Sequence, residues 1–92
     1  MSSKFRLRIK REMETEKPTV WIGKNGITPE TIGEISKQLD KREMVKVKLL
    51  KSALIEEKAK HVAEEIAQQT EATLIDVRGH TFVLYKRRKR KN

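Results

Sequence analysis

The order of apolar patterns along residues 3–85 constrains the fold more than any other feature of the chain. Apolar residues recur every three or four positions across 28–39 and 52–67, as they do on the buried face of a helix. The segments between and after these two stretches are short and rich in β-branched and aromatic residues, which favours strands. The predicted strands are Thr19–Ile22, Met44–Leu50, Thr73–Arg78 and Thr81–Tyr85.

Residues 3–15 fit two different patterns. Phe5, Leu7 and Ile9 alternate as in a strand, whereas Phe5, Ile9 and Met13 fall on one face of a helix. The Lys, Arg, Glu and Met residues around them have high helix propensity. We therefore predict a helix that ends before the first strand.

The pair Gly79-His80 separates the last two strands and predicts a tight antiparallel hairpin with glycine at the first turn position. The element order is then αβαβαββ. The simplest arrangement of this order is an α/β (α+β) fold with packed helices and one four-stranded mixed sheet. A chain of 92 residues suits one domain. We expect this domain at 1–88 and a basic, disordered tail at 89–92.

The basic residues are concentrated at the two ends of the chain. The sequence has 22 Lys plus Arg and 13 Asp plus Glu, which gives a net charge of +9. Residues 1–11 and 86–91 hold 11 of these basic residues and no acid, so the remaining body has a net charge of −2. Cationic ends attract a polyanion and gain binding free energy when its counterions are released. Nucleic acid is the expected partner; the alternative is a solvated tail that aids solubility.

The segment Gly23-Lys24-Asn25-Gly26 joins the end of a strand to the start of a helix, which Thr28 is expected to cap. Glycines allow positive φ angles and a close approach of another backbone. A GxxG loop clamps the nucleic-acid backbone in KH modules. The alternative interpretation is a plain tight turn, because Asn-Gly is a common turn pair.

Other basic side chains extend this candidate site. Lys46 and Lys48 share the polar face of their predicted strand, and Arg78 and His80 flank the hairpin tip. Each could contact phosphate, or could be an ordinary solvated residue. The terminal candidates for contact with nucleic acid are Arg6, Arg8, Lys10 and Arg11, followed by Lys86, Arg87 and Arg88.

The aromatic residues do not form the pattern of an RRM-type stacking platform. We expect Trp21 and Phe82 in the core, and we leave Tyr85 as a residue that could stack on a base.

Enzymatic chemistry is not expected from this sequence. It contains no cysteine, and His61 and His80 lack the spacing of metal ligands. No serine has a nucleophile-elbow motif. We expect no cofactor, no metal, no small-molecule substrate and no membrane association, and we expect a cytoplasmic monomer.

Several segments together resemble the CRM domain, whose name abbreviates chloroplast RNA splicing and ribosome maturation. The similarity covers residues 4–88 in the family's order and spacing, and it is closest to single-domain, YhbY-like members. The matching segments are Gly23–Thr28, Glu34-Ile35, Glu43–Lys48 and Val77–Lys86.

The resemblance implies a fold similar to the C-terminal domain of translation initiation factor three. It also implies RNA binding through the GxxG loop and the basic surface near it, and association with precursors of the large ribosomal subunit. Glu12 and Glu16 depart from the apolar pattern expected of the first helix, and the basic tail lies beyond the shared pattern.

Two alternatives remain open at this point. An Alba-type DNA-binding architectural protein is also small and basic, but it needs a long hairpin arm, and Gly79-His80 makes a short one. A constitutive ribosomal protein would account for the basic ends equally well.

Overall fold

The computed structural model describes residues 2–23, 26–50 and 56–87. Its element order is αβαβαββ, which confirms the order expected from the sequence. Residues 51–55, which include the start of the helical pattern expected at 52–67, lie outside the described residues. The elements are α1 (Ser3–Glu14), β1 (Val20–Ile22), α2 (Pro29–Arg42), β2 (Met44–Leu49), α3 (Glu56–Thr70), β3 (Thr73–Arg78) and β4 (Thr81–Tyr85).

The four strands form one mixed sheet in the order β1-β2-β4-β3. β1 pairs with β2 in parallel, and the β2–β4 and β3–β4 pairs are antiparallel. Gly79 has a φ of 60°, and it is the first of the two residues between β3 and β4. The expected mixed sheet and the glycine-first hairpin are therefore both confirmed.

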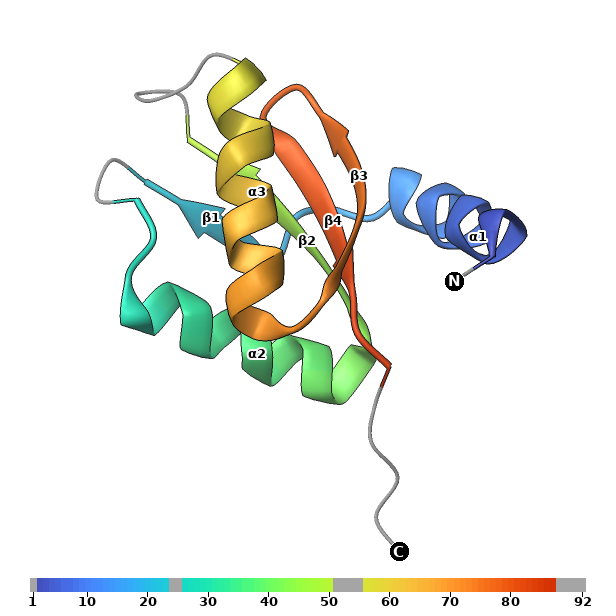
Figure 1. Ribbon diagram of the computed structural model, residues 1–92, viewed down its shortest axis with the longest axis horizontal. Coiled ribbons are helices and arrows are strands. Elements are labelled where there is room, and N and C mark those ends of the chain that lie inside the picture. The colour runs from blue at the N-terminus through green and yellow to red at the C-terminus, as the bar shows by residue number, and fades with distance from the viewer. Residues whose placement is uncertain (1, 24–25, 51–55, 88–92) are drawn as a thin grey trace, which may run out of the picture.

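The sheet lies between two unequal helical layers (Figure 1). Alternate residues of each strand point to opposite faces, so Val45, Val47 and Leu49 of β2 enter the main core together with residues of α2 and α3. The opposite face contacts α1 through a smaller cluster that includes Val83 of β4. The largest fully buried side chains are Phe82, Ile35, Leu39, Leu49, Ile66, Leu84, Val45 and Val47, so the expected core position of Phe82 is confirmed.

The start of α2 follows directly from local sequence chemistry. The Thr28 hydroxyl accepts a hydrogen bond from the Thr31 N–H at 3.1 Å, and a proline occupies the first turn. Ile27 and Ile32 pack against the main core on either side of this cap. α2 ends at Arg42; the cap residue Glu43 has a left-handed φ of 66°, and its N–H donates to the Leu39 carbonyl. The contacts at Thr28, Ile27 and Ile32 therefore set the point at which the loop before α2 ends.

The N-terminal segment is a helix, as the second of its two patterns predicted. Ile9 and Met13 are buried against Ile75 of β3 and Val83 of β4, and Phe5 packs at the edge of this cluster. α1 therefore covers part of the sheet face that α2 and α3 leave open.

The two acids that departed from the expected apolar pattern lie outside the small core. Glu12 forms an ion pair with Arg8 at 3.9 Å, and Glu16 forms one with Arg42 at 3.4 Å. Both carboxylates are about half exposed. The packing of α1 therefore does not depend on these two positions.

Candidate nucleic-acid interface

The glycine loop connects β1 to α2. The Gly26 N–H donates a hydrogen bond of 3.0 Å to the Gly23 carbonyl, and Gly26 has a left-handed φ of 71°. Any other L-residue at position 26 would adopt this φ at a cost. Lys24 and Asn25, the two polar residues of the predicted clamp, lie outside the described residues. The flanking geometry is therefore a closed turn that requires glycine on its C-terminal side.

One row of side chains crosses the sheet beside this loop. Trp21 is paired with Lys48 in the parallel register, Lys48 with Thr81, and Thr81 with Arg78. Paired residues on neighbouring strands present their side chains on the same face. This set of four, which we call the sheet row, therefore contains one aromatic residue, one hydroxyl and two cations.

The expectation that Trp21 belongs to the core is wrong. Its neighbours Val20 and Ile22 are the buried residues of β1, so strand alternation turns Trp21 to the opposite face. α1 packs against β3 and β4 on that face, and Trp21 remains 54% exposed. The pattern of two β-branched residues around the tryptophan was the signal that could have revealed this orientation.

The two lysines of β2 have different surroundings although they share a face. The Lys46 ammonium donates to the carbonyl oxygen of Met13 at 2.8 Å and to that of Glu16 at 2.9 Å. Lys48 is exposed, and its ammonium makes no hydrogen bond or ion pair with any part of the chain that the structure describes. Lys46 thus anchors the end of α1, whereas Lys48 can accept an anionic ligand.

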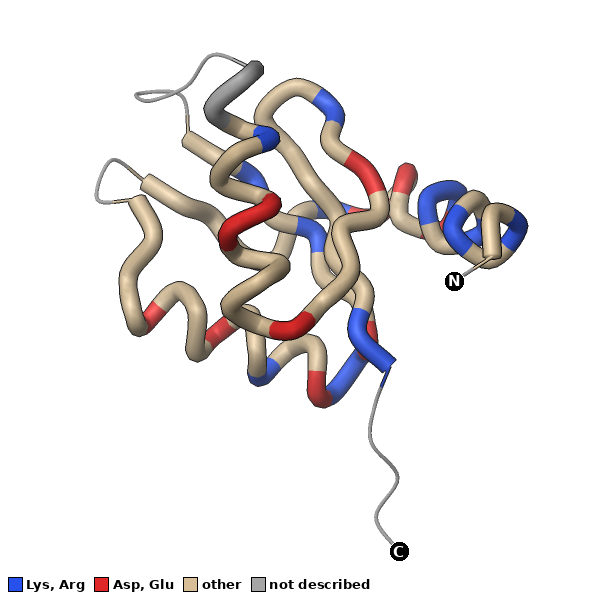
Figure 2. Tube along the Cα trace, in the orientation of Figure 1, with Lys and Arg blue, Asp and Glu red and all other residues tan. Residues whose placement is uncertain are grey.

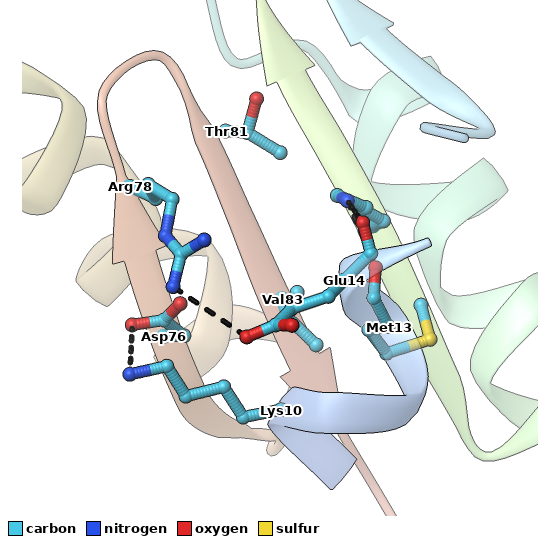
Figure 3. Close-up of a pocket in the computed structure, with 8 residues that line it drawn as sticks. Lys10, Met13, Glu14, Asp76, Arg78, Thr81 and Val83 are labelled. Carbon is cyan, nitrogen blue, oxygen red and sulfur yellow. Dashed lines mark hydrogen bonds and ion pairs between the residues drawn. The ribbon is translucent and has the colours of Figure 1, made fainter. Parts of the chain in front are cut away.

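A small polar hollow of about 170 Å³ separates the end of α1 from the sheet (Figure 3). On its walls Lys10 pairs with Asp76 at 3.8 Å, and Arg78 pairs with Glu14 at 3.7 Å. The Arg78 side chain is 66% exposed, so its pairing is weak and can be exchanged for a ligand at small cost. Arg78 thus belongs both to the lining of this hollow and to the sheet row.

Figure 2 shows Lys and Arg positions along α1, whose C-terminal part lines this hollow. Arg8 lies over the Phe5 ring at 5.2 Å from its centroid, in addition to its ion pair with Glu12. Arg6 and Arg11 are exposed and form no ion pair within the described ranges. Arg6, Arg8 and Arg11 are therefore exposed to solvent.

The basic residues after β4 lie close to the start of α1. Lys86 and Arg87 line one shallow hollow together with Ser2 and Phe5. The Lys86 N–H is held by the Glu43 carbonyl at 2.8 Å, and Arg87 is exposed, while Arg88 falls outside the described residues. Two basic segments from opposite ends of the sequence thus meet on one side of the molecule.

The remaining candidate residues have simple environments. His80 is exposed at the hairpin tip, where its carbonyl accepts a hydrogen bond from the Leu49 N–H at 2.7 Å. Tyr85 packs edge-on against Phe5, with ring centroids 5.0 Å apart. Within the described residues, no group of three or more His, Cys, Asp or Glu side chains could hold a metal ion. No described helix is long and apolar enough to cross a membrane.

Comparison with known proteins assigns a family to this arrangement. The family model described as the CRS1 / YhbY (CRM) domain matches residues 1–86. A protein of Methanocaldococcus jannaschii named as a probable RNA-binding protein is 32% identical over 88 residues. That match covers 96% of this chain but only 65% of the relative's length. A Bacillus subtilis protein, also named as a probable RNA-binding protein, is 35% identical over 72 residues, which cover 78% of this chain and 73% of the relative.

A solved structure has the same fold. The solution structure of a Staphylococcus aureus protein, described as a candidate RNA-binding protein, superposes with a TM-score of 0.82 at 27% sequence identity. The match covers 100% of this chain and 94% of the other. The mixed α+β architecture expected from the sequence is therefore confirmed by an independent structure.

Proposed function

Because the chain belongs to the CRS1/YhbY (CRM) domain family, we propose that it binds RNA through the glycine loop, the sheet row and the basic surface of α1. The observation that carries the proposal is the position of the loop. The Gly23–Gly26 turn lies at the end of β1 where the sheet face is uncovered and where Lys48 has no partner among the described residues. The names of the M. jannaschii and B. subtilis relatives support the same partner.

The proposed contacts fall into two groups. At the loop end, an RNA backbone would cross Gly23 and Gly26, with Lys24, Asn25 and the N-terminus of α2 toward its phosphates. At the basic end, flexible cations would neutralise further phosphates without reading the sequence. The cations and polar residues proposed to join these contacts are Lys48, Arg78, His80, Arg6, Arg8, Arg11, Lys86, Arg87 and Arg88.

Lys46 and Lys10 belong to the same surface but have a different proposed role. Lys46 already donates to two backbone carbonyls of the α1 end, and Lys10 is paired with Asp76. Moving either side chain to an RNA phosphate would break these contacts. We therefore propose that the main role of these two lysines is to hold α1 in position, and that direct phosphate binding is a minor role.

The proposed biological role is assistance in ribosome assembly, with precursor RNA of the large subunit as the target. This role follows from the family resemblance. The geometry of the site by itself indicates a partner with a phosphate backbone, and it does not indicate which RNA. The proposal includes no catalysis and no cofactor, and it includes a cytoplasmic location. It also includes a monomeric state, since a net charge of +9 opposes self-association.

Sedimentation of cell extracts tests the biological role. An assembly factor should travel with precursor particles of the large subunit and should be absent from mature ribosomes. Ultraviolet crosslinking followed by RNA sequencing should then recover unprocessed large-subunit RNA. Stoichiometric presence on mature particles would instead identify a constitutive ribosomal protein, and crosslinks mainly to DNA would favour an architectural role.

A further inference from the structure

We propose that Trp21 is a stacking platform for one unpaired base of single-stranded RNA, and that Lys48 holds a phosphate next to that base. This inference rests on the proposed RNA-binding function, and it adds that the sheet row prefers single-stranded RNA to a duplex. Neither the family comparison nor the glycine loop assigns a role to Trp21.

The position of Trp21 is the first argument. The large exposed hydrophobic residues among those described are Leu7, Trp21 and Leu50. Leu50 follows β2 directly, and its Cδ1 would lie 3.9 Å from a Cβ atom added at Gly23. Trp21 and Leu50 are thus both beside the glycine loop, although they are separated by 29 positions in the sequence. Trp21 is 54% exposed, and its indole ring is a flat apolar group close to the proposed path of the RNA backbone.

The charge next to the ring is the second argument. Lys48 is the register partner of Trp21 on the adjacent strand, and neighbouring strands lie about 4.8 Å apart. A lysine side chain is long enough to reach the phosphate of a nucleotide whose base stacks on the neighbouring ring. The sheet row contains no acidic residue, and its other cation, Arg78, is only weakly paired. The row therefore combines an aromatic surface with positive charge, as single-strand binding grooves do.

The shape of the site favours an unpaired base over a duplex. Bases inside an A-form helix are stacked on each other, and only their edges and the backbone are accessible. An indole face can therefore stack only on a base that is already unstacked. Such stacking tolerates any base, because every base has a π-face. The site should thus prefer single strands without a strong sequence preference.

The fluorescence of the parent protein gives a direct test, because Trp21 is the only tryptophan in the sequence. The probe is an oligouridylate of about twelve nucleotides, which is within the size range that single-strand binding folds cover. Stacking should quench the Trp21 emission as the strand is added. A fully paired RNA duplex of the same length should bind through its backbone with little quenching.

Two variants and a control complete the test, with affinity measured by fluorescence anisotropy of labelled RNA. Trp21→Ala should weaken oligouridylate binding by about five- to a hundredfold, which is the effect of losing one stacked base. Trp21→Phe should recover most of the affinity, because a smaller ring still stacks. Gln68→Ala is the control: it removes an exposed side chain on α3, which packs on the opposite face of the sheet, and it should leave the affinity unchanged.

The outcomes separate this inference from the proposed function. Binding with unchanged Trp21 emission, together with full affinity of Trp21→Ala, would overturn the stacking role and leave the RNA-binding proposal standing. If Trp21 is instead the binding site of a protein partner, adding RNA should likewise leave the Trp21 emission unchanged. If the parent binds neither the single strand nor the duplex, the proposed function and the inference both fail.

Discussion

The side-chain nitrogen of Lys46 lies 2.8 Å from the carbonyl oxygen of Met13, which precedes it by 33 positions in the sequence. A lysine in the middle of the sheet thus binds the last turn of α1. A cation at this point is favourable, because the final carbonyls of a helix lack partners within the helix and carry partial negative charge. The contact links the position of α1 to the face of β2 that also presents Lys48.

This relationship predicts different effects for two similar substitutions on β2. Lys46→Met keeps the length of the side chain but removes its donors, and should lower the free energy of unfolding by about 1–3 kcal/mol. Lys48→Met should change it by less than about 0.5 kcal/mol, because Lys48 is exposed. Urea denaturation followed by circular dichroism measures both.

In RNA binding, the larger effect should come from Lys48→Met and the smaller effect from Lys46→Met. Lys48→Met should reduce the slope of log K against log salt by about 1, which is the effect of losing one phosphate contact. Lys46→Met should leave the slope near that of the parent. Equal slopes for the two variants would mean that the structural difference between these lysines has no consequence for binding.

The turn at Gly26 predicts the sign of a glycine substitution. Gly26→Ala should destabilise the protein by about 1–2 kcal/mol, because alanine is strained at a φ of 71° although no atom lies within 4 Å of its Cβ. Gly33→Ala is the matched control, because Gly33 is exposed within α2 and its added Cβ also meets open space. That change should stabilise the protein by about 0.5–1 kcal/mol. Thermal melting that moves both variants in the same direction would contradict the assigned turn geometry.

The C-terminal run predicts a change in salt dependence without a change in fold. Deleting residues 87–92 removes five basic residues but keeps Lys86, whose N–H is bound by the Glu43 carbonyl. The melting temperature should therefore stay within a few degrees, while the slope of log K against log salt should become clearly less steep. A slope that equals that of the full chain would exclude the tail from the interface.

The parts of the fold that follow from neighbouring residues were predictable from the sequence. Thr28 and Pro29 specify where α2 begins, and Gly79 specifies the hairpin, because each acts within its own turn. The helical character of α1 was predictable once the helix propensity of the surrounding residues was added to the spacing of Ile9 and Met13. These signals depend on a few adjacent positions and need no knowledge of the tertiary structure.

The parts that depend on long-range packing were not predictable in the same way. The helical pattern of α1 does not specify which sheet face it covers, or how much of that face stays open. The exposure of Trp21 and the anchoring role of Lys46 both result from this placement. For the candidate site, the sequence therefore indicated the basic residues, but it did not separate those that hold the fold from those that are free to bind.

The most direct test of the central claim is the RNA affinity of the double variant Lys24→Asp plus Asn25→Asp, measured at physiological salt. The variant keeps Gly23 and Gly26, so its melting temperature should barely change. If an RNA backbone crosses this loop, the affinity should fall at least tenfold, since one or two charge-assisted contacts of about 1.5–3 kcal/mol each are lost. A folded double variant that binds RNA as tightly as the parent would contradict the claim and would show that the loop is only a turn.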